Sequence, residues 1–176
     1  PYRLVAQTQG APDFTGTAAG SVVYDDRVFG PGGFTGQLRS APGRSLVTQV
    51  IRRGDAAIVG ESLTDGDGAF SVSFVGHRDA EYHLRVLAAV DVGGLRGAVQ
   101  DRTSAHLVYA LDSAPWSGSA VPALALRASA EQSIGPALNI ADQLGVGMRF
   151  VRAYTDAQAP PMAVRTVVLM SPGVRP

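Results

Sequence analysis

Two segments in the middle of the chain, 69–75 and 81–90, alternate between apolar and polar side chains. A period of two places every second side chain on one face of an extended chain, which is typical of a half-buried β-strand. We therefore predict that both segments are strands, joined by residues 76–80, and that their apolar side chains share one core. These core residues are Phe70, Val72, Phe74, Tyr82, Leu84 and Val86.

Shorter apolar segments recur along most of the chain, separated by glycines and prolines. Turn signals at intervals of about 8–12 residues are typical of all-β sandwiches. Two stretches, 25–44 and 112–120, are predicted loops, because glycine, proline and isolated aromatic side chains gather there. The further predicted strands are 2–7, 17–24, 45–52, 57–63, 97–101 and 106–111.

The pattern changes near residue 130, where apolar residues begin to recur at spacings of three and four. This is the periodicity of one helix face, and it predicts a helix over 134–154 that covers part of the sandwich. Arg149 and Arg152 should then point outward. Gly145 and Gly147 lower helix stability, so a kink or break is allowed there.

These elements predict a mainly β fold: a transthyretin- or Ig-like antiparallel β-sandwich with one C-terminal helical segment and a final strand. The final strand is expected over 164–170, which is apolar on both faces. A length of 176 residues suits one domain. We expect an N-terminal extension with a strand (1–16), the sandwich (17–128), and a helical segment plus C-terminal strand packed on the sandwich (129–176).

Composition narrows the function classes. Fifteen basic and fifteen acidic residues leave no basic surplus for nucleic acid, and no apolar run has the length of a membrane span. Cysteine and lysine are both absent. This excludes disulfides, thiolate zinc sites, cysteine nucleophiles and Schiff-base lysines. His77, His83 and His106 do not form a metallopeptidase motif, and no nucleophile-elbow motif is present. We therefore predict that the protein is not an enzyme and needs no cofactor. Because the chain begins with Pro1 and not Met, we expect a processed or excised segment.

The most distinctive motif is Thr-Asp-Gly-Asp-Gly-Ala-Phe at 64–70. Asp65 and Asp67 are candidate calcium ligands, with Asp25 or Asp26 as a third carboxylate, because calcium prefers clustered oxygen ligands. A plain hairpin turn, held by bonds from aspartate side chains to the backbone, explains the same residues and is the favoured alternative.

This motif resembles the turn of carboxypeptidase regulatory-like domains, which have a transthyretin-like β-sandwich fold. The segments 20–24, 46–51 and 82–86 follow that family's order, so the resemblance covers about residues 17–90. Residues 134–142 also look like the helix that follows such sandwiches in large secreted bacterial proteins, where a metallopeptidase-like domain comes next. The resemblance implies an extracellular or cell-surface location.

Three functions remain open. The first is a non-catalytic extracellular structural or interaction protein, such as a self-assembling fibre subunit, whose terminal strand, with Tyr2 and Leu4, pairs with copies of itself or with neighbouring domains. The second is an accessory, pre-peptidase domain of a secreted bacterial metallopeptidase-like protein. The third is a carbohydrate- or calcium-binding module. The aromatic residues that would bind a sugar or a partner are Phe29, Phe34, Tyr109 and Trp116.

Overall fold

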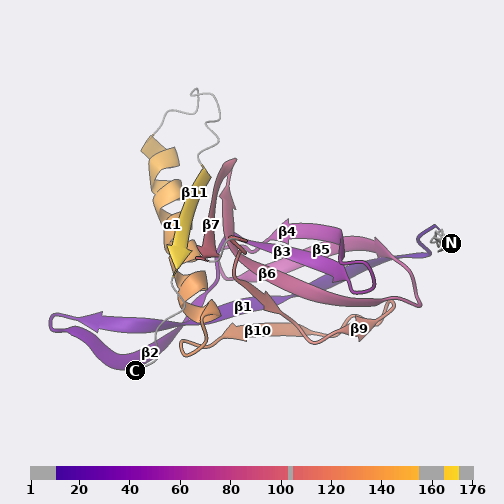
Figure 1. The fold of residues 1–176 in the computed structure, drawn as a ribbon, viewed down its shortest axis with the longest axis horizontal. Helices are drawn as coiled ribbons and strands as arrows, with labels where there is room; N and C mark the ends of the chain where they lie inside the picture. Colours follow the sequence, from indigo (N-terminus) through magenta and orange to yellow (C-terminus); the bar gives the residue numbers. More distant parts are fainter. Residues whose placement is uncertain (1–10, 103–104, 155–164, 171–176) are drawn as a thin grey trace, which may run out of the picture.

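The computed structural model describes residues 11–102 and 105–154, and the backbone of 165–170. Two β-sheets pack face to face, and one helix covers part of the core between them (Figure 1). The mainly β sandwich with a C-terminal helix that the sequence predicts is confirmed. Within these residues, no helix combines the length and hydropathy needed to cross a bilayer.

The first sheet is organised by β1, a strand of 17 residues. Strand β5 pairs antiparallel with the first half of β1, and β2 pairs antiparallel with the second half. On the opposite edge, β10 runs parallel to the middle of β1. Gly20 permits this pairing, because a Cβ there would lie 1.8 Å from the Leu124 carbonyl oxygen. The strands are β1 (Phe14–Gly30), β2 (Gly33–Pro42), β5 (Ala69–Gly76) and β10 (Leu124–Ala128).

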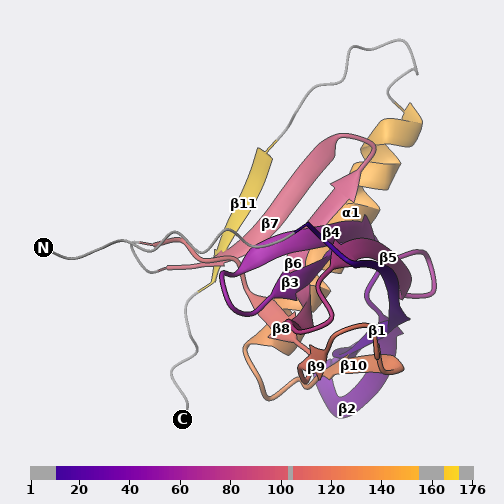
Figure 2. The ribbon, with the colours of Figure 1, turned by 90° about the vertical axis from the view of Figure 1, so that its right-hand side faces the viewer.

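The second sheet has the strand order β11-β7-β6-β3-β4, with the short strands β8 and β9 also paired to β6. All its pairs are antiparallel except β7 with β11, which lies beside β7 at the edge of the sheet (Figure 2). The strands are β3 (Leu46–Arg52), β4 (Ala57–Leu63), β6 (Glu81–Val92), β7 (Leu95–Asp101), β8 (Ala110–Asp112), β9 (Trp116–Ser117) and β11 (Arg165–Met170).

The core lies between the sheets, and the strand registers predicted for β5 and β6 are confirmed. All six predicted core residues are buried. Phe74 and Tyr82 approach with ring centroids 5.3 Å apart, and Phe14 packs edge-on against both rings. The turn between β4 and β5 carries the chain from one sheet to the other. Gly68 has a φ of 77° in this turn, and its carbonyl accepts a hydrogen bond from the Val22 amide of β1.

Helix α1 (Ile134–Tyr154) confirms the predicted helix and contacts β1, β6 and β7. It continues through Gly145 and Gly147, so the break that was allowed there does not occur. The prediction that Arg149 and Arg152 point outward is wrong for Arg149, which is half-buried and donates a hydrogen bond to the Ser45 hydroxyl. The exposed Arg152 places its guanidinium against Gly93. Both arginines lie along the sandwich because the C-terminal half of the helix passes close to the β6–β7 turn.

Several predicted boundaries are corrected. The segment 25–44, predicted as a loop, is mostly the second half of β1 and all of β2, joined by a two-residue turn at Pro31 and Gly32. Its side chains are largely exposed on both faces, so it lacks the alternation that identifies a half-buried strand. The predicted loop 112–120 contains β9 and the end of β8.

The remaining differences concern pairing and ends. The sandwich begins at Phe14, three residues before the expected boundary, and β1–β10 and β7–β11 are parallel pairs in a fold predicted to be antiparallel. The predicted hairpin of 97–101 and 106–111 is reduced to a bridge between Gln100 and Val108, because β8 pairs with β6. The expected final strand is β11. The predicted strand 2–7 lies outside the described residues.

Candidate interaction surfaces

A β-hairpin arm projects from the sandwich at one end of the molecule's long axis (Figure 1). We call residues 25–40 the arm: they comprise the second half of β1 and most of β2. Within the described residues, β2 pairs with β1 alone, and its residues 33–40 are all exposed. The outer edge of β2 therefore presents backbone N–H and C=O groups to solvent, the kind of edge that accepts a further strand.

The arm ends in a pair of exposed aromatic side chains, which we call the arm tip. Phe29 and Phe34 face each other across the hairpin with ring centroids 4.0 Å apart, yet they remain 67% and 62% exposed. The guanidinium carbon of Arg27 lies 5.8 Å from the Phe34 ring centroid. The structure thus places two of the sequence-predicted partner-binding residues together, on a surface that is both apolar and basic.

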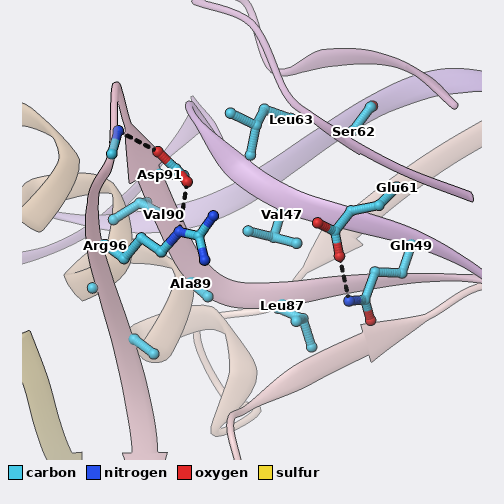
Figure 3. A pocket seen from close by; sticks show the side chains of 13 residues that line it. Val47, Gln49, Glu61, Ser62, Leu63, Leu87, Ala89, Val90, Asp91 and Arg96 are labelled. Atoms are coloured by element: carbon cyan, nitrogen blue, oxygen red, sulfur yellow. Dashed lines mark hydrogen bonds and ion pairs between the residues drawn. The ribbon is translucent and has the colours of Figure 1, made fainter. Parts of the chain in front are cut away.

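A groove lies on the face of the second sheet that is turned away from the core (Figure 3). It has a volume of about 710 Å³ and is formed by residues of β3, β4, β6 and β7. Strand alternation explains its lining: when Leu46 and Val50 of β3 point into the core, Val47 and Gln49 point out of it. We call this site the outer groove. Its apolar wall consists of Val47, Leu63, Leu87 and Ala89.

Two polar pairs lie at different sides of the outer groove (Figure 3). Gln49 donates a hydrogen bond of 2.7 Å to Glu61, and Arg96 pairs with Asp91 at 2.8 Å. Hydrogen bonds from the Gly94 amide and Arg96 lower the pKa of Asp91, so this carboxylate is ionised and neutralised. Glu61 has no cationic partner among the described residues. The groove therefore combines apolar surface with one uncompensated carboxylate.

The two candidate calcium ligands lie in the turn before β5. One carboxylate oxygen of Asp65 accepts hydrogen bonds of 2.9 Å from the amides of Asp67 and Ala69. Asp25 is bound by Arg127, and Asp26 by Arg39 and Asn139. In the part of the chain that the structure describes, no three acidic, histidine or cysteine side chains come together around a possible ion. The Asp65 bonds to backbone amides are those expected of a turn residue, but the predicted hairpin is wrong, because β4 and β5 belong to different sheets.

The four aromatic residues predicted to bind a sugar or a partner do not form one surface. Trp116 of β9 is only 6% exposed and packs between Phe74 and Tyr82, so it closes the end of the core and is not available to a partner. Its indole N–H has no hydrogen-bond partner within the described residues. Tyr109 is half-buried beside the same core, away from the arm tip. Tyr2 and Leu4 lie outside the described residues.

One histidine occupies an unusual position. The side chain of His83, on β6, is 14% exposed, and neither ring nitrogen has a hydrogen-bond partner among the described residues. Its Nε2 lies 3.7 Å from Asp112, whose pKa is lowered mainly by the hydrogen bond from Arg85. Burial lowers the pKa of His83, and the attraction of Asp112 only partly opposes this. The neutral imidazole is therefore favoured in the folded state.

A buried polar cluster, missed by the sequence analysis, joins α1 to the sandwich. Asp142 is fully buried and accepts hydrogen bonds from the Tyr24 hydroxyl at 3.1 Å and from Arg44 Nε at 2.9 Å. Burial and the neighbouring carboxylate raise the pKa of Tyr24, so the tyrosine stays a neutral donor. Asp142 falls on the apolar face of the helical pattern, beside Leu138. A charged residue at such a position indicates a buried polar contact, and this was the signal available in the sequence.

Comparison of this chain with protein-family models, with curated proteins and with solved structures gave no match. The resemblance to carboxypeptidase regulatory-like domains therefore remains an expectation from the motif at 64–70.

Proposed function

We propose that the protein is a non-catalytic structural or interaction protein of the cell exterior, and that its copies join end to end through the N-terminal strand. The observation that supports this most is the open edge of β2. Within the described residues, this ten-residue strand pairs on one side only, and such an edge is a template onto which another strand can add. Strand addition satisfies such backbone groups without a deep pocket.

The layout of β1 gives this contact a direction. Phe14 pairs with Gly76 at one end of β1, and Gly30 pairs with Gly33 at the other, where the arm ends. A strand of 17 residues spans roughly 55 Å. Residues 11–13, which precede β1, therefore lie far from the arm of the same copy. Pairing between the terminal strand of one copy and the β2 edge of another is head-to-tail, and a head-to-tail contact that does not close produces a filament.

The sequence of the terminal segment suits this role. Residues 2–7 (Tyr-Arg-Leu-Val-Ala-Gln) are a predicted strand, and a short stretch with Gly10 and Pro12 separates them from β1. A strand on such a tether can reach another molecule. The zero net charge adds no long-range repulsion between copies.

The test is a deletion of residues 1–9, compared by electron microscopy and sedimentation with the intact chain at the same concentration. The matched control replaces residues 1–9 with nine glycine and serine residues, which keeps the length and removes the strand. We expect filaments from the intact chain and monomers from both variants. Unchanged assemblies in either variant, or no assembly by the intact chain, would overturn the proposal.

A further inference from the structure

We propose that the arm tip of one copy docks into the outer groove of a second copy, with Arg27 of the tip pairing with Glu61 of the groove. This contact rests on the proposed function, because it is a second point at which copies of the chain meet. The two contacts use different parts of the chain. Docking uses side chains of the arm tip and of the second sheet, whereas strand addition uses the backbone edge of β2 and residues 1–10.

The arm tip has the character of a docking element. Phe29 and Phe34 leave most of their ring surface in water, and the neighbouring Leu38, also on the arm, is exposed as well. Aromatic side chains contribute the largest apolar areas to interfaces, and a pair already in contact loses little conformational freedom on binding. Three large apolar side chains on one projecting hairpin are therefore a site of interaction.

The outer groove fits this occupant in size and polarity. Its volume of about 710 Å³ lies within the range of sites that enclose a compact group of side chains. Val47, Leu63 and Leu87 provide an apolar wall against which phenylalanine rings can pack. The groove is partly open to solvent, so side chains of a hairpin can enter it.

The unpaired charges of the two surfaces are opposite in sign. Glu61 is held toward the groove by Gln49 and has no cation partner in the described part of the chain. The Arg27 guanidinium lies near the Phe34 ring and forms no ion pair with a described residue, although Glu131 lines the small hollow beside it. In the groove, Arg96 already neutralises Asp91. Docking would thus pair a cation and a carboxylate that form no ion pair within the described part of the chain.

The tip and the groove of one chain do not meet. The arm continues the first sheet beyond the sandwich, whereas the groove lies on the outward face of the second sheet (Figure 1). Occupation of the groove by a tip therefore requires a second copy. Because the two surfaces differ, the contact is compatible with a continuing chain of subunits when it is not made reciprocally by two copies.

The absence of cysteine from the chain allows a direct test by cross-linking. One preparation carries Gly32→Cys at the arm turn, and the other carries Ala98→Cys in the groove. After mixing and addition of a short bismaleimide, we expect a cross-linked heterodimer. The control replaces Gly32→Cys with Gly54→Cys, an exposed turn glycine elsewhere whose added Cβ would also meet nothing. A yield no higher than that of this control would overturn the docking.

Charge exchange then tests the pairing. Arg27→Glu on the copy with the arm cysteine, or Glu61→Arg on the copy with the groove cysteine, should lower the cross-linking yield by about tenfold, because like charges then meet. The two substitutions together should restore it. Glu131 lies beside Arg27 in the same chain, so Glu131→Arg on the arm copy is the control. This substitution should leave the cross-linking yield unchanged. Failure of the double exchange to restore the yield would contradict the Arg27–Glu61 pair.

The outcome is separable from that of the proposed function. The same cross-linking is repeated with copies that lack residues 1–9. Cross-links that persist there support docking even if the deletion shows that strand addition is wrong. Cross-links at control level contradict docking even if filaments depend on the terminal strand. Thermal melting of each variant confirms that the substituted chains are folded.

Discussion

At the scale of single residues, the most consequential side chain is the buried carboxylate of Asp142. A charge removed from water is tolerated only when it is paired and hydrogen-bonded, and here Arg44 and the Tyr24 hydroxyl meet that need. The cluster joins α1, the β2–β3 connection and β1, three elements that are distant in the sequence. Its loss should therefore loosen the helix from the sandwich.

We predict that Arg44→Ala lowers the free energy of unfolding by about 3 kcal/mol, because Asp142 is then left as a buried charge without a cation. Urea denaturation followed by fluorescence measures this. The control is Arg53→Ala, which breaks the exposed pair with Glu81 and should cost less than about 1 kcal/mol. Equal losses in the two variants would show that Asp142 does not depend on Arg44.

His83 gives a prediction for pH. Its folded-state pKa is lowered from the ordinary value of about 6.5, so the unfolded chain binds the proton more tightly. The free energy of unfolding should therefore fall as the pH drops below about 6.5. Asp112, Arg85 and Arg53 are the charged groups that act on the ring.

Denaturation at pH 7 and at pH 5 tests this dependence. His83→Gln removes the titration and should show the smaller loss of stability between these two values. His106→Gln, at an exposed position, is the control and should retain the loss of the unsubstituted chain. A His83→Gln variant that loses as much stability as the unsubstituted chain would refute the assignment.

At the scale of elements, the alternation of β5 determines which residues support the core. Phe74 packs against Phe14, Tyr82 and Trp116, whereas its neighbour Val75 is exposed. We predict that Phe74→Ala lowers the free energy of unfolding by about 3–5 kcal/mol, the range for removal of a buried aromatic side chain.

Val75→Ala is the matched control on the same strand and should change stability by less than about 1 kcal/mol. Chemical denaturation of both variants makes the comparison. The reverse order of the two losses would mean that the strand register is shifted by one residue, since such a shift exchanges the two faces.

The elements also show how far the sequence could predict this fold. The segments 69–75 and 81–90 carry a period of two because one face of each is buried, and α1 carries a period near 3.6 for the same reason. The arm lacks this signal because water contacts both of its faces. Phe29 and Phe34 were singled out as isolated aromatics, but only the hairpin register shows that they face each other.

The outer groove was beyond prediction for a different reason. Its residues come from four strands and the β6–β7 turn, and the apolar wall consists of side chains that point away from the core, next to buried neighbours in the sequence. Asp142 was hidden in the same way, within an apolar helical face. Sites assembled by strand pairing leave no local pattern, so the candidate surfaces required the structure.

At the scale of the whole molecule, the fold is asymmetric in a way that favours linear assembly. The arm is at one end of β1 (Figure 1), residues 11–13 lie at the other end, and the outer groove lies on the outward face of the second sheet. No two of these surfaces are the same, so a contact between them adds subunits in one direction when it does not close. A closed symmetric dimer would instead make the contact twice, each copy using both of its surfaces on its partner.

The final prediction is that the free terminal peptide stops growth of the assembly. A synthetic peptide of residues 1–9 should pair with the open β2 edge and occupy the place of the next subunit's strand. Filaments grown with an excess of peptide should be shorter, as measured by electron microscopy. The control peptide carries Leu4→Pro and Ala6→Pro, which remove two backbone N–H donors and oppose strand pairing. The proline peptide should leave filament length unchanged. Equal shortening by both peptides would assign the effect to side-chain contacts and contradict strand addition.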